Sequence, residues 1–183
     1  MKIENFTPVQ TTPYNLKTKL KIYLWKLVNK TIFRIIPNQI RQPRIILLNF
    51  FGAKISNNVF IHRNSNIEHP WNLEVGYLSS IGEDTWIYCL DKIIIGQKCT
   101  IGKNVSLITG SHHLDRLDFR LKTKPIIIKD GCWITTGAVL LPGVSLSEFT
   151  VIGVNSVVNK DSAPFDVISG NPAKVISTRK FLI

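Results

Sequence analysis

Two adjacent histidines, His112 and His113, stand where a regular aliphatic pattern stops, and they are the residues best suited to proton transfer. The stretch Ile95–His112 reads IGQKCTIGKNVSLITGSH, with aliphatic residues six positions apart and a histidine at its end. A neutral imidazole, with a reference pKa of about 6.5, can take a proton from a hydroxyl group near neutral pH. Either histidine can therefore act as a general base if the chain around it forms a rigid support.

That support is predicted by a six-residue repeat that extends far beyond this stretch. Glycine often follows the repeated aliphatic residue, and small or β-branched residues often stand four positions after it. Three such units make a triangular coil of about 18 residues, and stacked coils bury one another's aliphatic side chains. The repeated positions are Ile55, Ile61, Ile67, Val75, Ile81, Ile87, Ile95, Ile101, Leu107, Ile128, Ile134, Leu140, Leu146, Ile152 and Val158.

The repeat predicts an all-β fold, a parallel β-helix of about five coils. Residues 113–127 break the period and are largely polar and basic, so we expect a loop extruded after the third coil. Long loops in compact repeats are usually functional or are tolerated insertions. The pattern slips by two residues after Asn72 and after Lys92, which assigns the coils to 55–72, 75–92, 95–112, 128–145 and 146–163.

The segment before the repeat is expected to form a basic helical cap. Residues 1–15 show no apolar period and indicate an extended arm, whereas Leu16 to Ile36 has helical spacing and Pro37 should end that helix. A second helix is expected from Pro43 to Phe51, with Gly52 just past its end. The chain therefore divides into an arm and cap at 1–54, a β-helix at 55–163 and a C-terminal tail at 164–183, where Pro164, Gly170 and Pro172 oppose regular coiling.

Positive charge is concentrated in this N-terminal segment. The whole chain carries a net charge of +11, but Asn5–Ile67 contains ten basic and no acidic residues. An anionic partner is therefore expected there. In one interpretation Trp25, Phe33 and the lysines contact an anionic membrane surface. In the other, the lysines are only solvated, and the end of the main fold is covered by the apolar face of Leu16, Leu20, Leu24, Leu27 and Val28.

Several classes of protein are disfavoured by the composition. Cys89, Cys99 and Cys132 form no CxxC pair, which favours a reducing compartment, and the inward positions of Cys99 and Cys132 favour packing over thiol chemistry. Neither a secretory signal nor an apolar run of about 18 residues is apparent, so we expect a cytoplasmic protein, at the inner face of the membrane if the cap binds lipid. No nucleic-acid partner is expected, because no recognised motif accompanies the basic segment.

The other conspicuous side chains are expected to be structural. His62 and His69 lie in the first coil, which we expect to be far from the 113–127 loop, and we expect them to make surface or cap contacts. Three tryptophans are expected to cover coil faces at subunit contacts or to line a groove, namely Trp71, Trp86 and Trp133.

The repeated pattern [LIV]-G-x-x-[STVAC]-x resembles that of the hexapeptide-repeat acyltransferases. More narrowly, the chain resembles colanic-acid-biosynthesis-type acetyltransferases, which modify exopolysaccharide sugars, in LLNFFGAKI, HPWNLEVG, SSIGEDTWIY, ITGSH, PIIIKDGCWI, LPGVSL and SGNPAKVI. The similarity covers about residues 20–178. It implies a left-handed β-helix, a homotrimer with active sites between subunits, and acetyl transfer from acetyl-CoA to a sugar or lipid-linked oligosaccharide in polysaccharide biosynthesis.

The resemblance implies that His112, in the GSH motif, is the catalytic base, with His113 as its rival. The sugar hydroxyl would attack the thioester directly, and backbone N–H groups of a neighbouring coil would stabilise the oxyanion. These relatives commonly place Asp directly after the histidine, whereas this chain has His113 there, with Asp115 and Asp118 further on. Which acid, if any, orients the His112 imidazole is therefore left open.

The resemblance also implies an acetyl-CoA site in the groove between subunits. Lys160 and Lys174 can meet CoA phosphates as charge-assisted donors, and Gly153 can let the pantetheine approach the backbone; in the alternative, both lysines are only solvated. The matching positions are Thr135, Thr136, Gly153, Val154, Asn159, Lys160 and Lys174.

Three alternatives remain beside this function. One is an acetyltransferase for a small-molecule or xenobiotic acceptor, and another is a non-catalytic β-helix platform. The third, a zinc carbonic anhydrase of the same architecture, needs three converging histidines, but Leu117 stands five positions after His112 and no third histidine is placed to help, so no metal is expected.

Overall fold

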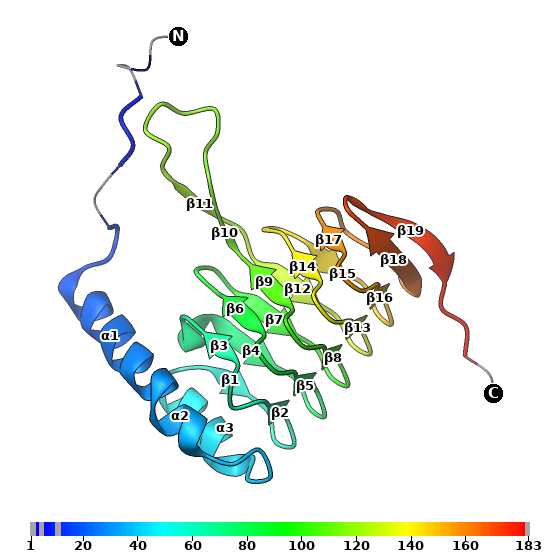
Figure 1. Cartoon of the computed structure of the whole chain (residues 1–183), viewed down its shortest axis with the longest axis horizontal. Helices are drawn as coiled ribbons and strands as arrows, with labels where there is room; N and C mark the ends of the chain where they lie inside the picture. The colour runs from blue at the N-terminus through cyan, green and yellow to red at the C-terminus, as the bar shows by residue number, and fades with distance from the viewer. Residues whose placement is uncertain (1–2, 4–5, 10–11, 182–183) are drawn as a thin grey trace.

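The computed structural model describes residues 3, 6–9 and 12–181, which form a β-solenoid of about six turns with helices at its N-terminal end (Figure 1). Three sheets run along the solenoid, and their strands are parallel except for the last one, β19 (Ala173–Thr178). The first contains β1 (Lys54–Ile55), β4 (Leu73–Val75), β7 (Ile93–Ile95), β12 (Ile126–Ile128) and β15 (Ser145–Leu146). The second contains β2 (Phe60–Ile61), β5 (Ser80–Ile81), β8 (Thr100–Ile101), β13 (Trp133–Ile134), β16 (Val151–Ile152), β18 (Asp166–Gly170) and β19 (Ala173–Thr178). The third contains β3 (Asn66–Ile67), β6 (Trp86–Tyr88), β9 (Ser106–Ile108), β14 (Val139–Leu140) and β17 (Val157–Val158).

The predicted register is confirmed in every coil. Ile55 pairs with Val75 and Val75 with Ile95, and the series continues to Ile128 and Leu146 across the 113–127 interruption. All fifteen predicted aliphatic positions are buried in one continuous core. Since a single coil cannot bury its own aliphatic face, the stack is the unit that folds.

Hydroxyl side chains at the small inward positions tie neighbouring coils together. The Ser79 hydroxyl donates to the Gly96 carbonyl oxygen at 2.7 Å, and the Thr85 hydroxyl contacts the Gly102 carbonyl oxygen at 3.0 Å. Cys99 and Cys132 occupy equivalent inward positions and are buried, as expected. Polar groups at the turns therefore find partners one coil away.

The helical cap forms, but its packing face differs from the prediction. The helices are α1 (Leu16–Lys30), capped by the Asn15 side chain, then α2 (Ile32–Ile35) and α3 (Gln42–Phe50). Trp25 and Phe33 are fully buried, and the Trp25 indole N–H donates to the Ile67 carbonyl at the end of the solenoid. The leucines expected to cover the fold are instead exposed: Leu16, Leu20, Leu24 and Leu27.

Each interpretation of the cap is therefore wrong in part, although Val28 packs against the core as the second one expected. Trp25 and Phe33 cannot touch a membrane because they pack on the solenoid, and the leucine stripe does not cover it. The large aromatic rings bury more apolar area than the leucines, so they determine which face of α1 turns inward. Within the described residues, no helix is long and apolar enough to span a bilayer.

The interrupted segment is extruded after the third coil, as expected, and its two arms pair as a hairpin. Strands β10 (Gly110–His112) and β11 (Leu121–Thr123) pair antiparallel and project from the side of the solenoid (Figure 1). The N-terminal arm follows its tip, with the Thr7 N–H donating to the Leu117 carbonyl and the Val9 N–H to the Asp118 carbonyl, at 3.1 and 2.9 Å. The arm and the hairpin therefore enclose space beside the first coils.

The C-terminal tail, where regular coiling was not expected, nevertheless adds two strands to the second sheet. Strand β18 pairs parallel with β16, joining Val167 to Val151 and Ile168 to Ile152. Strand β19 then turns back antiparallel on β18. Gly170 and Pro172 lie at the turn between these two strands, so they end the coil without preventing one more strand from joining it.

Candidate active site

His112 is the last residue of β10, and its ring is held by the segment that leads into β11. Its Nδ1 lies 2.7 Å from the carbonyl oxygen of Phe119. The Phe119 ring stacks on the imidazole, with 4.4 Å between centroids and an interplanar angle of 1°. Because a carbonyl oxygen can only accept, Nδ1 carries the hydrogen in the neutral ring, and Nε2 keeps a free lone pair that can accept a proton.

No acid touches this imidazole in the part of the chain that the structure describes. Asp115 lies 3.5 Å from Nδ1 of the neighbouring His113. Asp118 pairs with Arg116 at 3.1 Å and with Arg120 at 2.6 Å, and these contacts hold the pKa of its carboxyl group well below its usual range. The group that orients His112 is therefore a backbone carbonyl, which residue types alone could not reveal.

A large cavity lies between the arm, α1, the first two coils and the hairpin, and we call it the hairpin cavity. Its volume is about 960 Å³, within the usual range for small-molecule sites. Polar side chains come to it from all four parts. They are Thr12, Tyr14, Lys19, Lys26, Glu68, His69, Tyr88, His112, Arg120 and Thr123.

A second space, the edge groove, lies on the other side of the hairpin and has a volume of about 520 Å³. His112 and His113 both line it, together with Lys122, Lys124 and Asn159. His112 also lines the hairpin cavity, whereas His113 does not. Only the first of the two predicted histidines therefore faces both spaces.

Three of the predicted CoA-contacting residues lie next to the edge groove. Asn159 lines both that groove and a third space of about 410 Å³, the tail groove, which is also lined by Lys160 and Lys174. Both lysines are exposed. The structure therefore brings Asn159, Lys160 and Lys174 to the side of the solenoid that carries His112.

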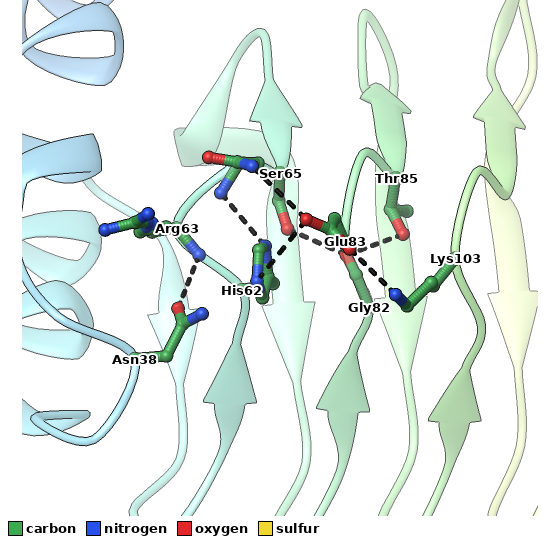
Figure 2. A network of polar contacts seen from close by, with 9 residues as sticks. Asn38, His62, Arg63, Ser65, Gly82, Glu83, Thr85 and Lys103 are labelled. Atoms are coloured by element: carbon green, nitrogen blue, oxygen red, sulfur yellow. Dashed lines mark hydrogen bonds and ion pairs between the residues drawn. The ribbon is translucent and has the colours of Figure 1, made fainter.

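The other four predicted CoA contacts lie at a different corner of the triangular coil. Thr135 and Thr136 follow β13, while Gly153 and Val154 follow β16, in turns that lead from the second sheet to the third. We call this the stacked corner; it comprises 62–65, 82–85, 102–105, 135–138 and 153–156 (Figure 2). His112 instead projects from the hairpin corner. This corner comprises the turns that lead from the third sheet back to the first, at 68–72, 89–92, 109–125 and 141–144, together with 159–162, which follow the last strand of the third sheet.

Gly153 has a structural reason to be glycine. A Cβ atom there would lie 2.4 Å from the Ser169 hydroxyl oxygen on β18. We predicted that pantetheine would approach the backbone closely at Gly153. Within this chain it is the C-terminal strand β18 that makes this close approach.

His69 was expected to be remote from the loop, and this expectation is wrong. It is only 5% exposed, and it lines the hairpin cavity together with His112. The solenoid brings the end of the first coil beneath the hairpin, although 43 positions separate the two histidines in sequence. The sequence signal at this position was the HPWN stretch. Its last three residues form the short 3-10 helix η2 (Pro70–Asn72), which directly follows His69.

The tryptophans and cysteines have separate roles. Trp86 donates its indole N–H to Glu68 at 2.8 Å, Trp71 lies 4.2 Å from the Lys21 ammonium group, and Trp133 is half exposed on the second sheet.

Burial raises the pKa of the Cys89 thiol to about 12, as befits a packing residue. Among the described residues, no three His, Cys, Asp or Glu side chains gather in a metal-binding arrangement.

The chain is similar in sequence to bacterial acetyltransferases. It is 38% identical over 160 residues to the protein named "Putative colanic acid biosynthesis acetyltransferase WcaF" of Escherichia coli K12, covering 87% of this chain and 88% of the relative. No protein-family model matches the chain.

Solved structures share the fold. A hexapeptide-repeat acetyltransferase of Vibrio cholerae complexed with acetyl coenzyme A superposes with a TM-score of 0.79 at 22% identity, covering 99% of this chain and 100% of the other. A maltose O-acetyltransferase of Clostridium difficile superposes with a TM-score of 0.81 at 24% identity, covering 91% and 90%. Given the repeat, the solenoid and the 38% identical relative, this chain belongs to the hexapeptide-repeat acetyltransferases.

Proposed function

We propose that this protein transfers an acetyl group from acetyl-CoA to a sugar hydroxyl in polysaccharide biosynthesis, with His112 as general base. The observation that carries the proposal is that His112 lines both the hairpin cavity and the edge groove, with a free Nε2. One space can hold the acceptor and the other the thioester. The name of the Escherichia coli relative and the acetyl coenzyme A in the Vibrio cholerae structure support both substrates.

In this mechanism Nε2 of His112 takes the proton from the acceptor hydroxyl as its oxygen attacks the thioester carbonyl carbon. The tetrahedral oxyanion collapses, the carbon–sulfur bond breaks, and the imidazolium returns its proton to the CoA sulfur. The Phe119 carbonyl keeps accepting from Nδ1 throughout, so it stabilises the imidazolium that forms. Backbone N–H groups of a neighbouring coil would bind the oxyanion.

The test is acetyl transfer from labelled acetyl-CoA to a panel of free, nucleotide-linked and lipid-linked sugars, with chloramphenicol as a xenobiotic control. We expect transfer to a sugar, and we expect acetyl-CoA to raise the melting temperature through preferential binding to the folded state. Absence of both effects would favour a non-catalytic platform. Transfer to chloramphenicol alone would identify a xenobiotic acceptor.

We also propose that the active unit is a homotrimer whose sites are shared between subunits. Support comes from the division of the predicted CoA contacts: Asn159 and Lys160 lie at the hairpin corner, with Lys174 of β19 beside them in the tail groove, while Thr135, Thr136, Gly153 and Val154 lie at the stacked corner. A neighbouring subunit that brings its stacked corner to the edge groove would complete one site. Sedimentation equilibrium should then give three times the 20.7 kDa chain mass, and a monomeric yet fully active protein would refute sharing.

A third proposal concerns the outer face of α1, which we expect to contact an anionic membrane surface. Leu16, Leu20, Leu24 and Leu27 are 84, 59, 45 and 54% exposed, and their spacing places them in one stripe. Lys17 and Lys30 are exposed on the same helix, and the described part of α1 carries no acid. Apolar and basic side chains together match the interface of an anionic bilayer.

The membrane proposal predicts co-sedimentation with phosphatidylglycerol vesicles at low salt and release at high salt. Leu20→Glu with Leu24→Glu should abolish binding. If these changes instead remove a concentration-dependent self-association, the stripe is an interface between copies of the chain.

A further inference from the structure

Among the described residues, His69 is the buried polar side chain with the most atoms that lack a hydrogen-bond partner. Both ring nitrogens are buried and have no hydrogen-bond partner in the described structure. Most buried polar side-chain atoms in folded proteins do have a partner. The ring is flanked by Trp71 with centroids 5.2 Å apart and by Tyr14 at 5.8 Å, and it lines the hairpin cavity. A neutral imidazole placed there offers one donor and one acceptor to whatever fills the cavity.

Glu68, next to it, is held in place with one oxygen to spare. Its Oε1 accepts the Trp86 indole N–H at 2.8 Å, and among the described residues its Oε2 accepts no hydrogen bond. The carboxylate is half-buried and also lines the hairpin cavity. A carboxylate next to an imidazole is well suited to forming hydrogen bonds with the hydroxyl groups of a sugar.

The α1 wall of the same cavity is cationic. Lys19, Ile22 and Lys26 face it, three and four residues apart on one side of the helix. Within the described residues, neither lysine has a carboxylate within the 4.0 Å of an ion pair, whereas Arg120 on the hairpin side is paired with Asp118. The cavity is therefore lined by two lysines without an ion-pair partner among the described residues and by the single carboxylate of Glu68.

We propose that His69, Glu68 and Lys26 form an acceptor subsite for a sugar that carries an anionic group, either a carboxylate or a phosphate. His69 and Glu68 bind hydroxyl groups, and Lys26, assisted by Lys19, binds the anion. The inference rests on the acetyl transfer proposed above and specifies its acceptor. A volume of about 960 Å³ leaves room for more than one hexose ring beside the reacting hydroxyl at His112.

The first test uses His69→Phe, which keeps an aromatic ring and removes the two unpaired nitrogens. If His69 serves binding, the substitution leaves the melting temperature unchanged or raises it, because a buried unsatisfied polar group is removed. The KM for the acceptor should nevertheless rise about tenfold with little change in kcat, the loss expected for one or two hydrogen bonds. A fall in melting temperature with an unchanged KM would make His69 a purely structural residue and overturn its part in the subsite.

The second test compares three probes on the full chain saturated with CoA: methyl β-glucoside, methyl β-glucuronide and glucose 1-phosphate. Calorimetry should give at least one charged probe a Kd about tenfold below that of the neutral glucoside. Preference for the glucuronide identifies a carboxylate, and preference for glucose 1-phosphate identifies a phosphate. Lys26→Met should remove the preference, while Lys17→Met, an exposed lysine of α1 outside the cavity, should keep it.

The outcomes separate this inference from the proposed function. If acetyl-CoA neither binds nor donates an acetyl group to any sugar, the acetyl transfer itself fails. If transfer occurs but charged and neutral probes bind equally, or none of the three binds, only the subsite is refuted. Retained preference in Lys26→Met would also refute it.

Discussion

His62 and His69 stand seven positions apart in the first turn of the solenoid, yet they meet opposite environments. His62, at the stacked corner, accepts the Asn64 N–H at 3.2 Å through Nδ1, and its Nε2 lies 4.0 Å from Glu83, which in turn binds Lys103 at 2.8 Å (Figure 2). His69, at the hairpin corner, has no partner for either nitrogen among the described residues.

The difference follows from how the coils stack at each corner. At the stacked corner every turn has an equivalent turn one coil above it, so the Ser65 hydroxyl reaches the Gly82 carbonyl and the Thr85 hydroxyl the Gly102 carbonyl. At the hairpin corner the third coil extrudes residues instead of closing. The turn that holds His69 is still tied to the next coil, because the Asn72 side-chain amide donates to the Cys89 and Leu90 carbonyls at 3.0 Å. The His69 ring differs in lining the hairpin cavity, where no described residue gives it a partner.

The largest expected effect is at the interruption itself. His112→Ala should lower kcat for acetyl transfer about a thousandfold, as loss of a general base usually does. His113→Ala should keep roughly the wild-type rate, because its ring lines only the edge groove. Steady-state kinetics with acetyl-CoA and the best acceptor measures both. A larger loss for His113→Ala would exchange their roles.

His69, whose ring nitrogens have no hydrogen-bond partner among the described residues, should make the free energy of unfolding depend on pH. Burial, and secondarily the positive charge of Lys26, lowers the pKa of His69 from its ordinary value of 6.5 to about 4. Between these values the unfolded chain binds more protons, so stability is complete above about pH 6.5 and falls as the pH drops toward 4, by up to about 3 kcal/mol. The other polar groups lining its cavity include Tyr14, Glu68, Tyr88 and His112.

Urea unfolding at pH 7, 5.5 and 4.5 checks this expectation. His69→Phe cannot take up the proton, so its free energy of unfolding should fall less than that of the wild type over this range. Equal slopes for the two proteins would show that another group causes the acid sensitivity.

The two corners should respond differently to one added methyl group. At the stacked corner, the Cβ of Gly82→Ala would lie 2.7 Å from the Gly102 carbonyl carbon, and rigid backbone cannot yield cheaply. We expect a loss of about 2 kcal/mol in the free energy of unfolding, measured by chemical denaturation.

At the hairpin corner, the Cβ of Gly110→Ala would meet only side chains, the Leu90 Cδ1 at 2.8 Å and the Tyr88 Cε1 at 2.9 Å. Those side chains can move, so stability should fall less, but both line the hairpin cavity and the acceptor KM should rise. If Gly82→Ala impaired acceptor binding more than Gly110→Ala, the functional contrast between the corners would be wrong.

The smallest expected effect concerns the shape of the hairpin. Asp118→Asn weakens the contacts to Arg116 and Arg120 beside the Phe119 carbonyl, and we expect kcat to fall about tenfold as His112 loses its fixed orientation. Asp115→Asn is the matched control, because that side chain is 85% exposed and, among the described residues, its one ion pair is with His113. Equal rates for the two variants would mean that the Phe119 carbonyl needs no support from the ion pairs of Asp118 with Arg116 and Arg120.

Most of the fold was readable in the sequence because the period of six is a local property. Each aliphatic residue from Ile55 to Val158 marks its own coil position, and parallel stacking then follows without further information. The packing face of the cap was harder to predict from the sequence. Helix α1 has two apolar stripes, and only packing against the solenoid end decided that Trp25 would turn inward.

The candidate site divides in the same way. By itself the sequence determined the solenoid, the position of the interruption and the histidines that border it, because residue types and spacing encode these directly. Only the tertiary structure decided that a carbonyl of Phe119 holds His112 and that His69 from the first coil lies in the same cavity. A backbone carbonyl carries no residue-type signal, and the contact between distant coils depends on where the arm, α1 and the hairpin pack together.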